Sequence, residues 1–502
     1  MSKAYFVILH QKTSIMKIGF DNEKYQKIQS EHIKERISQF DGKLYLELGG
    51  KLFDDHHASR VLPGFMPDSK LRMFQKLSDS IEIVIVISAT DIEKNKKRAD
   101  LGITYDEDVL RLRGEFQNRG FMVGSVVITH YNGQPAATAF RQRLEREGIK
   151  TYYHYLIEGY PHNVSLIASD EGFGQNDYVE TERPLVIVTA PGPGSGKMAV
   201  CLSQLYNENK RGVRAGYAKF ETFPVWNLPL KHPVNIAYEA ATADLNDVNM
   251  IDPFHLEAYN KIAINYNRDI EIFPVLNALF EGIYGSNPYE SPTDMGVNMV
   301  GFCISDDEAC CEASKNEIVR RYYAATNKMA CGACNEHEIA KIQLLFNQAK
   351  ITTDFRRTTV AAKNFKKETG HTSAAIELED GTIITAKSSE LLGCSAALLL
   401  NVMKHLAGID HDLKLIPQSM IEPIQHTKIS YLGGRNPRLH TDEVLVALSV
   451  LSVHDDNCHR ALEQLPKLRG CQAHCTVMLS DVDQKIFKKL GVNLTCEPVL
   501  KK

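Results

Sequence analysis

The chain contains 502 residues, and because a domain holds roughly 150 residues, about three domains are expected. Hydrophobic residues make up 43% and charged residues 24% of the chain, which excludes a disordered or collagen-like protein. The formal net charge of −4 gives no general electrostatic reason to bind nucleic acid or an anionic membrane.

The apolar runs are too short for a membrane protein. The longest, 81–89 and 444–453, fall below the roughly 20 residues that a membrane helix needs. The N-terminal segment 1–10 has an apolar run too short for a signal peptide and is typical of a first strand. Eleven scattered cysteines do not resemble a secreted disulfide framework, so reduced thiols are expected. We therefore expect a cytoplasmic protein.

Strand and helix signals alternate through the first third of the chain. The β-branched run 81–87 is apolar enough for a buried central strand. Thr104 and Glu107 have the spacing of a capping box for a helix that Gly120 ends. Further elements are strands over 43–48, 122–129 and 151–157 and a helix between Pro135 and Gly148. This α/β alternation predicts a layered, Rossmann-like or P-loop-like parallel sheet in an N-terminal domain over 1–305.

The remaining chain predicts a helical connector and a second α/β domain. Helical patterns such as 316–326 and 336–349 dominate the connector, 306–367. The C-terminal domain, 368–502, opens with two strands around Asp380-Gly381, a signal for a two-residue type I′ hairpin turn. We expect a nearly all-apolar helix over 390–406 to be buried, followed by a strand over 474–479, a helix over 482–490 and a strand over 492–496.

The most informative segment resembles a phosphate-binding P-loop. An apolar strand over 185–190 leads into a glycine-rich loop and a helix from Met198. In such loops glycines let backbone N–H groups surround an anion, while the helix N-terminus and a lysine supply positive charge. The candidate phosphate ligands are Gly192, Gly194, Ser195, Gly196 and Lys197.

The match to the pattern G-x-x-x-x-G-K-[ST] is incomplete. Pro191 stands at the first glycine, and Met198 stands where a hydroxyl would bind Mg²⁺. A phosphate cradle tolerates both changes, but magnesium would need Ser195, Thr189 or an acid from elsewhere. The alternative is a structural strand-to-helix turn with a solvated lysine.

Acids, histidines and a lysine gather in the segment that follows. Lys219-Phe220-Glu221 lies on a probable strand, and the hydrophobic neighbours of the later acids predict partial burial, with shifted pKa values. Because ligands bind at the carboxyl ends of parallel strands, we expect this cluster to share a cleft with Lys197. The alternative is a set of helix caps and ion pairs. The expected catalytic residues are Asp252, His255, Glu257 and Lys219, and the expected metal ligands are Asp244 and Asp252.

The cysteines offer two weaker metal hypotheses. Cys331 and Cys334 form one C-x-x-C pair, half of a zinc site or else two small core residues. The order of elements in the last quarter of the chain resembles the cytidine-deaminase-type fold, which implies zinc ligands near Cys394, Cys471 and Cys475. The glutamate of that motif is absent after Cys394 and the later cysteine pair is one residue too widely spaced, so we expect core thiols.

Over nearly its full length the chain resembles a bacterial family of soluble proteins of about this size, known as conserved and of unknown function. The resemblance rests on the segments 189–197, 243–257 and 433–439. It implies a fold and a bacterial cytoplasmic setting, and it implies no particular activity.

Together these features predict an enzyme that binds a nucleotide, such as ATP with Mg²⁺, or another phosphorylated small molecule. The place of Lys219 and Glu221 on the strand after the loop's helix is similar to that of substrate-contacting groups in ATP-dependent ligases, and a transferase is equally open. The alternative is a non-catalytic metabolite-binding or scaffold protein that retains the phosphate cradle. Neither nucleic acid nor a membrane is expected as a partner, and a homo-oligomer is left open.

Overall fold

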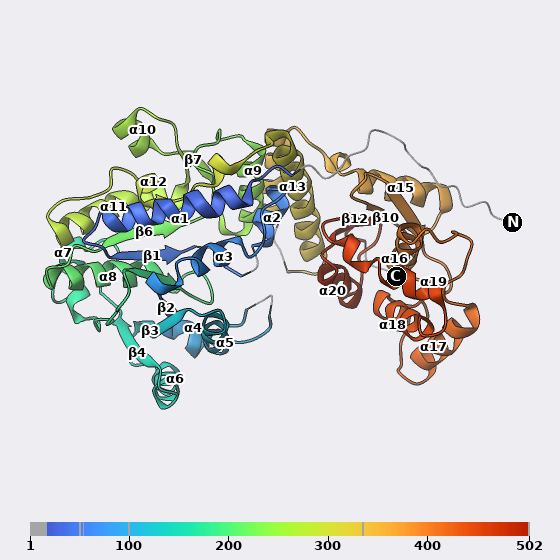
Figure 1. Ribbon diagram of the computed structural model, residues 1–502, viewed down its shortest axis with the longest axis horizontal. Coiled ribbons are helices and arrows are strands. Elements are labelled where there is room, and N and C mark those ends of the chain that lie inside the picture. Colours follow the sequence, from blue (N-terminus) through green and yellow to red (C-terminus); the bar gives the residue numbers. More distant parts are fainter. Residues whose placement is uncertain (1–17, 50–51, 54, 99–100, 334–335, 500–502) are drawn as a thin grey trace. The chain divides into compact units, whose positions relative to one another are not determined.

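The computed structural model describes residues 18–49, 52–53, 55–98, 101–333 and 336–499 (Figure 1). The chain divides into two compact units. Residues 19–238 and 247–307 form what we call the N-terminal unit, and residues 239–246 and 308–499 belong to the C-terminal unit. The first strand predicted within 1–10 lies outside the described residues, as does Cys334.

A parallel sheet forms the centre of the N-terminal unit (Figure 1). Among the described residues it has seven strands in the order β4-β3-β2-β5-β1-β6-β9. All neighbouring strands run parallel, which confirms the predicted parallel sheet. Every residue of the predicted central strand is buried. The strands are β1 (Leu44–Leu48), β2 (Ile81–Ser88), β3 (Met122–Tyr131), β4 (Lys150–Tyr155), β5 (Leu185–Thr189), β6 (Gly216–Phe220) and β9 (Gly296–Val297).

Helices cover both faces of this sheet and produce the predicted layers. One face packs through Leu46 and Ile85 against α3 (Ser69–Gln75), α5 (Tyr105–Gln117) and α6 (Pro135–Arg146). The other packs through Val186 and Tyr217 against α8 (Lys197–Lys210) and α11 (Asn267–Tyr284). The capping box of α5 forms as predicted, with the Glu107 carboxylate accepting the Thr104 N–H at 3.3 Å.

Further elements complete the N-terminal unit. Between β6 and β9 the chain makes a long excursion that returns α11 to the sheet. Among the described residues, no helix combines the length and the apolar character that crossing a membrane requires. The other elements are α1 (Asn22–Ser38), α2 (His56–Val61), α4 (Ala89–Glu93), α7 (Val164–Ile167), α9 (Pro233–Ala241), α10 (Pro253–Tyr259), α12 (Pro292–Met295), β7 (Asn249–Ile251) and β8 (Ile264–Tyr266).

The C-terminal unit contains a mixed sheet in the order β11-β10-β12-β13. Its strands β10 (Ser373–Glu377) and β11 (Ile383–Lys387) are antiparallel, whereas β12 (Gln472–Cys475) and β13 (Asn493–Cys496) are parallel. The apolar helix α16 (Cys394–Leu406) is buried against this sheet as predicted. The other helices are α13 (Asp307–Ala330), α14 (Glu336–Ala349), α15 (Arg357–Thr369), α17 (Gln418–Ser430), α18 (Thr441–Leu451), α19 (Asp456–Leu462) and α20 (Asp481–Lys489).

The predicted type I′ turn at Asp380-Gly381 is wrong. That turn needs positive φ at both residues, but only Gly381 has it, at 82°. The Gly381 N–H donates to the Leu378 carbonyl at 2.9 Å, and the Asp380 carboxylate accepts the Thr382 N–H at 2.9 Å. The local side-chain bond favours a longer turn with glycine alone in the left-handed region.

Candidate functional site

The glycine-rich loop joins β5 to α8 as the sequence predicts. Strand β5 ends at Thr189 and helix α8 begins at Lys197. Gly194 and Gly196 have φ values of 72° and 84°, which only glycine adopts without strain. The loop therefore directs the N-terminal end of a 14-residue helix toward the carboxyl edge of the sheet.

Strand β3 holds this loop in place. The Thr129 hydroxyl donates to the Ser195 carbonyl at 2.6 Å, and a Cβ at Gly196 would come within 3.2 Å of the Thr129 side chain. Ser195 is only 2% exposed, and its hydroxyl has no hydrogen-bond partner among the described residues. Buried polar groups nearly always have a partner, so this hydroxyl has the capacity to bind a ligand oxygen.

His130 is a residue that the sequence analysis missed. It follows Thr129 and has a φ of 51°, which is uncommon for a residue with a side chain. Its Nδ1 lies 3.1 Å from the Ser88 Oγ at the end of β2 and 3.3 Å from the Thr129 Oγ1. Burial lowers the pKa of His130, and Asp91 opposes that shift. A histidine directly after the buried, mostly apolar run within β3 is the signal that could have indicated it.

A second cluster lies two strands away, at the end of β6. The Lys219 Nζ contacts the two Asp269 carboxylate oxygens at 2.8 and 2.6 Å and the Glu221 Oε1 at 2.9 Å. It also donates to the Tyr266 hydroxyl at 2.7 Å, and that hydroxyl donates to Glu221. The Lys219, Glu221 and Asp269 side chains are 12%, 20% and 10% exposed, so solvent still reaches the cluster.

This environment shifts the protonation of both ends of the ion pair. Burial raises the pKa of Glu221 to about 7; Lys219 opposes the rise and Asp269 adds to it. Burial works against a charge on Lys219, yet Asp269 and Glu221 hold its pKa well above the usual value. Near neutral pH, Glu221 is therefore suited to both accepting and donating a proton.

Glu47 of β1 lies between the strand that leads into the loop and the strand that carries Lys219. It lies opposite Val188 of β5 and Lys219 of β6, and its carboxylate accepts the Tyr217 hydroxyl at 2.8 Å. Burial and Glu47 raise the pKa of the Cys201 thiol on α8, whereas Lys197 lowers it. Glu47 also acts on Lys219, so one buried carboxylate influences groups on both sides.

A cavity of about 40 Å³ adjoins the Lys219 cluster. Since one water needs at least about 10–15 Å³, it has room for a few waters or one small polar group. Its wall includes Trp226, the single tryptophan of the chain. Polar lining comes from Lys219, Glu221, Asn265, Asp269, Thr293 and Asn298.

Asp252, which we expected to be catalytic and to bind metal, makes the contacts of a helix cap. It is fully buried and accepts the N–H groups of Phe254 and His255 at 3.0 and 3.1 Å, at the start of α10. It also accepts the Thr293 N–H and hydroxyl at 3.2 and 2.6 Å. These four bonds occupy both carboxylate oxygens, as in the structural alternative.

The other expected members of the acidic cluster do not share one site with Lys219 among the contacts of the described residues. The His255 Nδ1 lies 3.1 Å from the Ser291 Oγ and 3.7 Å from Asp294. Glu257 is exposed. Asp244 belongs to the C-terminal unit, where its charge acts on Arg321. Of the four expected catalytic residues, only Lys219 belongs to the buried charge cluster.

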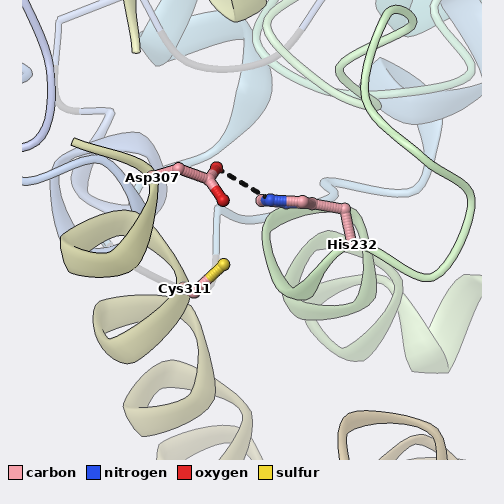
Figure 2. Close-up of side chains that lie close together, drawn as sticks. All are labelled: His232, Asp307 and Cys311. Carbon is pink, nitrogen blue, oxygen red and sulfur yellow. Dashed lines mark hydrogen bonds and ion pairs between the residues drawn. The ribbon is translucent and has the colours of Figure 1, made fainter. Parts of the chain in front are cut away.

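His232 of the N-terminal unit contacts an acidic side chain at the start of α13. Figure 2 shows His232, whose Nε2 lies 2.9 Å from the Asp307 Oδ1 at the start of α13. Asp307 is 62% exposed, so water screens the pair. We assign it no chemical role.

In the C-terminal unit Cys475 contacts Cys394 and Cys496, whereas the deaminase pattern would have brought in Cys471 instead of Cys496. Hydrogen-bond contacts with Cys394 and Cys496, together with burial, raise the pKa of the Cys475 thiol. The Cys471 thiol donates to the Lys467 carbonyl at 3.6 Å. Cys471, Cys475 and Cys496 are free thiols. The absence of zinc stays a prediction.

Comparison with known proteins identifies the family. Residues 18–350 match the domain of unknown function DUF1846, N-terminal, and residues 354–502 match its C-terminal counterpart. A UPF0371 protein of Corynebacterium urealyticum is 57% identical, over 96% of this chain and 97% of that protein. UPF0371 proteins of Streptococcus thermophilus and Streptococcus pyogenes are 56% and 54% identical, over 96% of this chain and 98% of each relative. The chain therefore belongs to the DUF1846 (UPF0371) family of conserved bacterial proteins.

Proposed function

We propose that this protein is an enzyme that binds a phosphorylated small molecule at the carboxyl edge of its parallel sheet. The observation that carries the proposal is the Glu221 carboxyl at the end of β6, which contacts the Lys219 Nζ at 2.9 Å and whose pKa burial raises to about 7. The strand order places β6 two strands from the loop that precedes α8. An anion site and a proton-transfer group therefore share one edge of the sheet, where ligands bind in parallel α/β folds.

The loop and the buried cluster have separate roles in this proposal. The N–H groups at the start of α8, the Ser195 hydroxyl and the Lys197 ammonium would hold the phosphate. Glu221 would exchange a proton with the ligand, and Lys219 would hold that carboxyl in place through its 2.9 Å contact. The Thr129 bond to the Ser195 carbonyl would fix the loop.

The described residues do not fit the magnesium site of a typical P-loop. The Met198 side chain has no oxygen to bind magnesium, and both Asp252 carboxylate oxygens accept hydrogen bonds. We therefore propose a phosphorylated ligand that needs no resident metal.

Binding of a simple phosphate ester tests the proposal. Full-length protein titrated with hexyl phosphate should show a saturable change in Trp226 fluorescence, because Trp226 lines the adjoining cavity. Lys197→Ala should weaken binding about tenfold or more, equivalent to about 1.4 kcal/mol. Lys210→Ala, at the other end of α8, is the matched control and should bind normally. Equal affinity in wild type and Lys197→Ala would contradict the phosphate site.

A non-catalytic binding protein is the second candidate, favoured by Met198 and by the structural contacts of Asp252. Incubation with a panel of phosphorylated metabolites, followed by mass spectrometry, separates the two. Conversion by wild type that Glu221→Gln abolishes supports an enzyme. Binding without conversion of any member supports the second candidate.

A further inference from the structure

We propose that the ligand carries an ammonium group as well as its phosphate, and that the ammonium group occupies the cavity beside Lys219, Glu221 and Asp269. This inference rests on the proposed phosphate site and adds the chemical class of the ligand. It predicts an aminoalkyl phosphate rather than a simple phosphate ester.

The charge around the cavity is the first argument. Glu47, Glu221 and Asp269 all act on Lys219, the cation of this cluster. Two of these carboxyl groups, Glu221 and Asp269, contact the Lys219 ammonium and line the cavity with it, so carboxyl groups outnumber ammonium groups among the described lining residues. A second cation entering the cavity would reduce this excess, and a low-dielectric setting strengthens the attraction.

The aromatic wall is the second argument. Trp226 lines the cavity, and its Nε1 donates to the Asn298 carbonyl at 2.8 Å, which fixes the ring. Tryptophan offers the strongest cation–π attraction of the aromatic residues. A cavity lined by both carboxylates and an indole ring is typical of sites that bind ammonium groups.

The size of the cavity restricts the group further. A volume of about 40 Å³ has room for an ammonium group with a water or two, but not for a sugar or an aromatic ring. The bulk of the ligand would then lie in the crevice outside the cavity.

The sheet sets the distance between the two charged ends of the ligand. Strands β5 and β6 are separated by β1, and neighbouring strands lie about 4.8 Å apart. The end of β5 and Lys219 are therefore separated by roughly 10 Å. A ligand that uses both sites needs a chain of several atoms between its phosphate and its nitrogen.

Binding of an ammonium group should also change the protonation of Glu221. The charged and titratable groups that act on Glu221 are Lys219, Asp269 and Tyr266, and Tyr238 interacts with it from α9. A second cation close to Glu221 favours its ionised form, so binding near pH 7 should release a proton.

The experiment compares aminohexyl phosphate with hexyl phosphate, using full-length protein and isothermal titration at pH 7. The wild type should bind aminohexyl phosphate at least tenfold more tightly than hexyl phosphate. Binding of the amine should also release more protons, and titrations in two buffers of different ionisation enthalpy measure this release. Asp269→Asn should reduce the affinity gained from the amine, and Glu221→Gln should abolish the additional proton release. Asp170→Asn, which removes a carboxylate bound to Lys210 away from the cavity, should retain both effects.

The outcomes separate this inference from the proposed function. If hexyl phosphate binds in a Lys197-dependent way but the amine adds no affinity, the inference fails and the phosphate site stands. If both Asp269→Asn and Glu221→Gln still bind aminohexyl phosphate more tightly than hexyl phosphate by the wild-type factor, the ammonium group lies elsewhere and the inference also fails. If neither compound shows Lys197-dependent binding, the proposed function itself fails. Thermal unfolding of each variant identifies any loss of folding.

Discussion

Asp252 shows how a carboxylate that resembles a catalytic residue in sequence can act as a structural one. Its side chain is fully buried, and two of its four hydrogen bonds go to Thr293, which lies 41 residues further along the chain. Truncation of such a buried carboxylate lowers the free energy of unfolding, because its hydrogen-bond donors are left without partners. Asp252 therefore fastens α10 to the segment that contains α12.

The first prediction is that Asp252→Ala lowers the free energy of unfolding by about 2–3 kcal/mol, through the lost cap and the unpaired Thr293 groups. Urea denaturation followed by Trp226 fluorescence measures this change in the N-terminal unit. Glu257→Gln on the same helix is exposed and should change the free energy by less than about 0.5 kcal/mol. Equal effects of the two substitutions would show that Asp252 does not act as a buried cap.

At the scale of the structural elements, helix α8 begins at a glycine that no other residue could replace without strain. Gly196 is the N-cap of α8 with a φ of 84°, and a Cβ there would meet the Thr129 side chain at 3.2 Å. Gly212, just after the same helix, has a φ of 80°, but a Cβ there would meet no atom of the described residues within 4 Å. Both positions have a positive φ that would strain a residue with a Cβ, and they differ in how crowded they are.

The second prediction compares these positions. Gly212→Ala should cost about 1 kcal/mol, because an alanine in the left-handed region is strained. Gly196→Ala should cost more, about 2 kcal/mol, because Thr129 must also move, and it should weaken hexyl phosphate binding. Denaturation and titration of both variants measure these effects. Identical losses and unchanged binding would rule out close packing of the loop on Thr129.

In the C-terminal unit, α20 is fastened to α18 by one carboxylate. Burial opposes ionisation of Asp483, but hydrogen bonds from His440, the Thr441 N–H and Ser480 lower its pKa to about 2. The Asp483 oxygens lie 2.9 Å from the His440 Nδ1 and from the Thr441 N–H. Because the folded pKa is below the unfolded value of about 3.9, ionised Asp483 stabilises the fold above pH 4.

The third prediction follows from the lowered pKa of Asp483 in the folded protein. Asp483→Asn should lower the unfolding free energy by about 2 kcal/mol at pH 7, and the deficit should shrink as the pH falls from 4 toward 2, when wild-type Asp483 also becomes protonated. Urea titrations followed by circular dichroism at pH 7 and pH 3 measure it. Asp481→Asn, on the exposed side of α20, is the control. A deficit of the same size at both pH values would contradict the pKa assignment.

At the scale of the whole molecule, the two units have separate hydrophobic cores. Ile187 is fully buried in the sheet of the N-terminal unit, and Leu399 is 1% exposed in the core around α16. Trp226 belongs to the N-terminal unit, so its fluorescence reports on that unit alone. Multidomain chains often unfold in more than one step.

The fourth prediction is that Leu399→Ala and Ile187→Ala affect different transitions of the full-length protein. Each should cost about 3 kcal/mol in its own core. Ile187→Ala should lower the denaturant midpoint measured by Trp226 fluorescence. Leu399→Ala should leave that midpoint unchanged and should shift only the unfolding transition that is followed by circular dichroism. A shift of the Trp226 midpoint in Leu399→Ala would show that the two cores unfold together.

The sequence by itself determined the features that depend on neighbouring residues. The apolar run of β2, the capping box of α5, the glycines before α8 and the all-apolar α16 are local patterns, and each forms the predicted element. The segments that carry the family resemblance were equally readable, and the family matches confirm it. Local patterns suffice here because backbone conformation and the buried face of an element follow from residue spacing.

Only the tertiary structure decided which side chains meet. Glu47 reaches the hydroxyl of Tyr217, 170 residues away, because β1 and β6 are neighbours in the sheet. Asp269 reaches Lys219 only because the chain returns as α11 after a long excursion. Thr293 and Asp252, which are far apart in the sequence, form a hydrogen bond for the same reason. Such contacts arise from strand order and helix packing, which residue spacing along one segment does not encode.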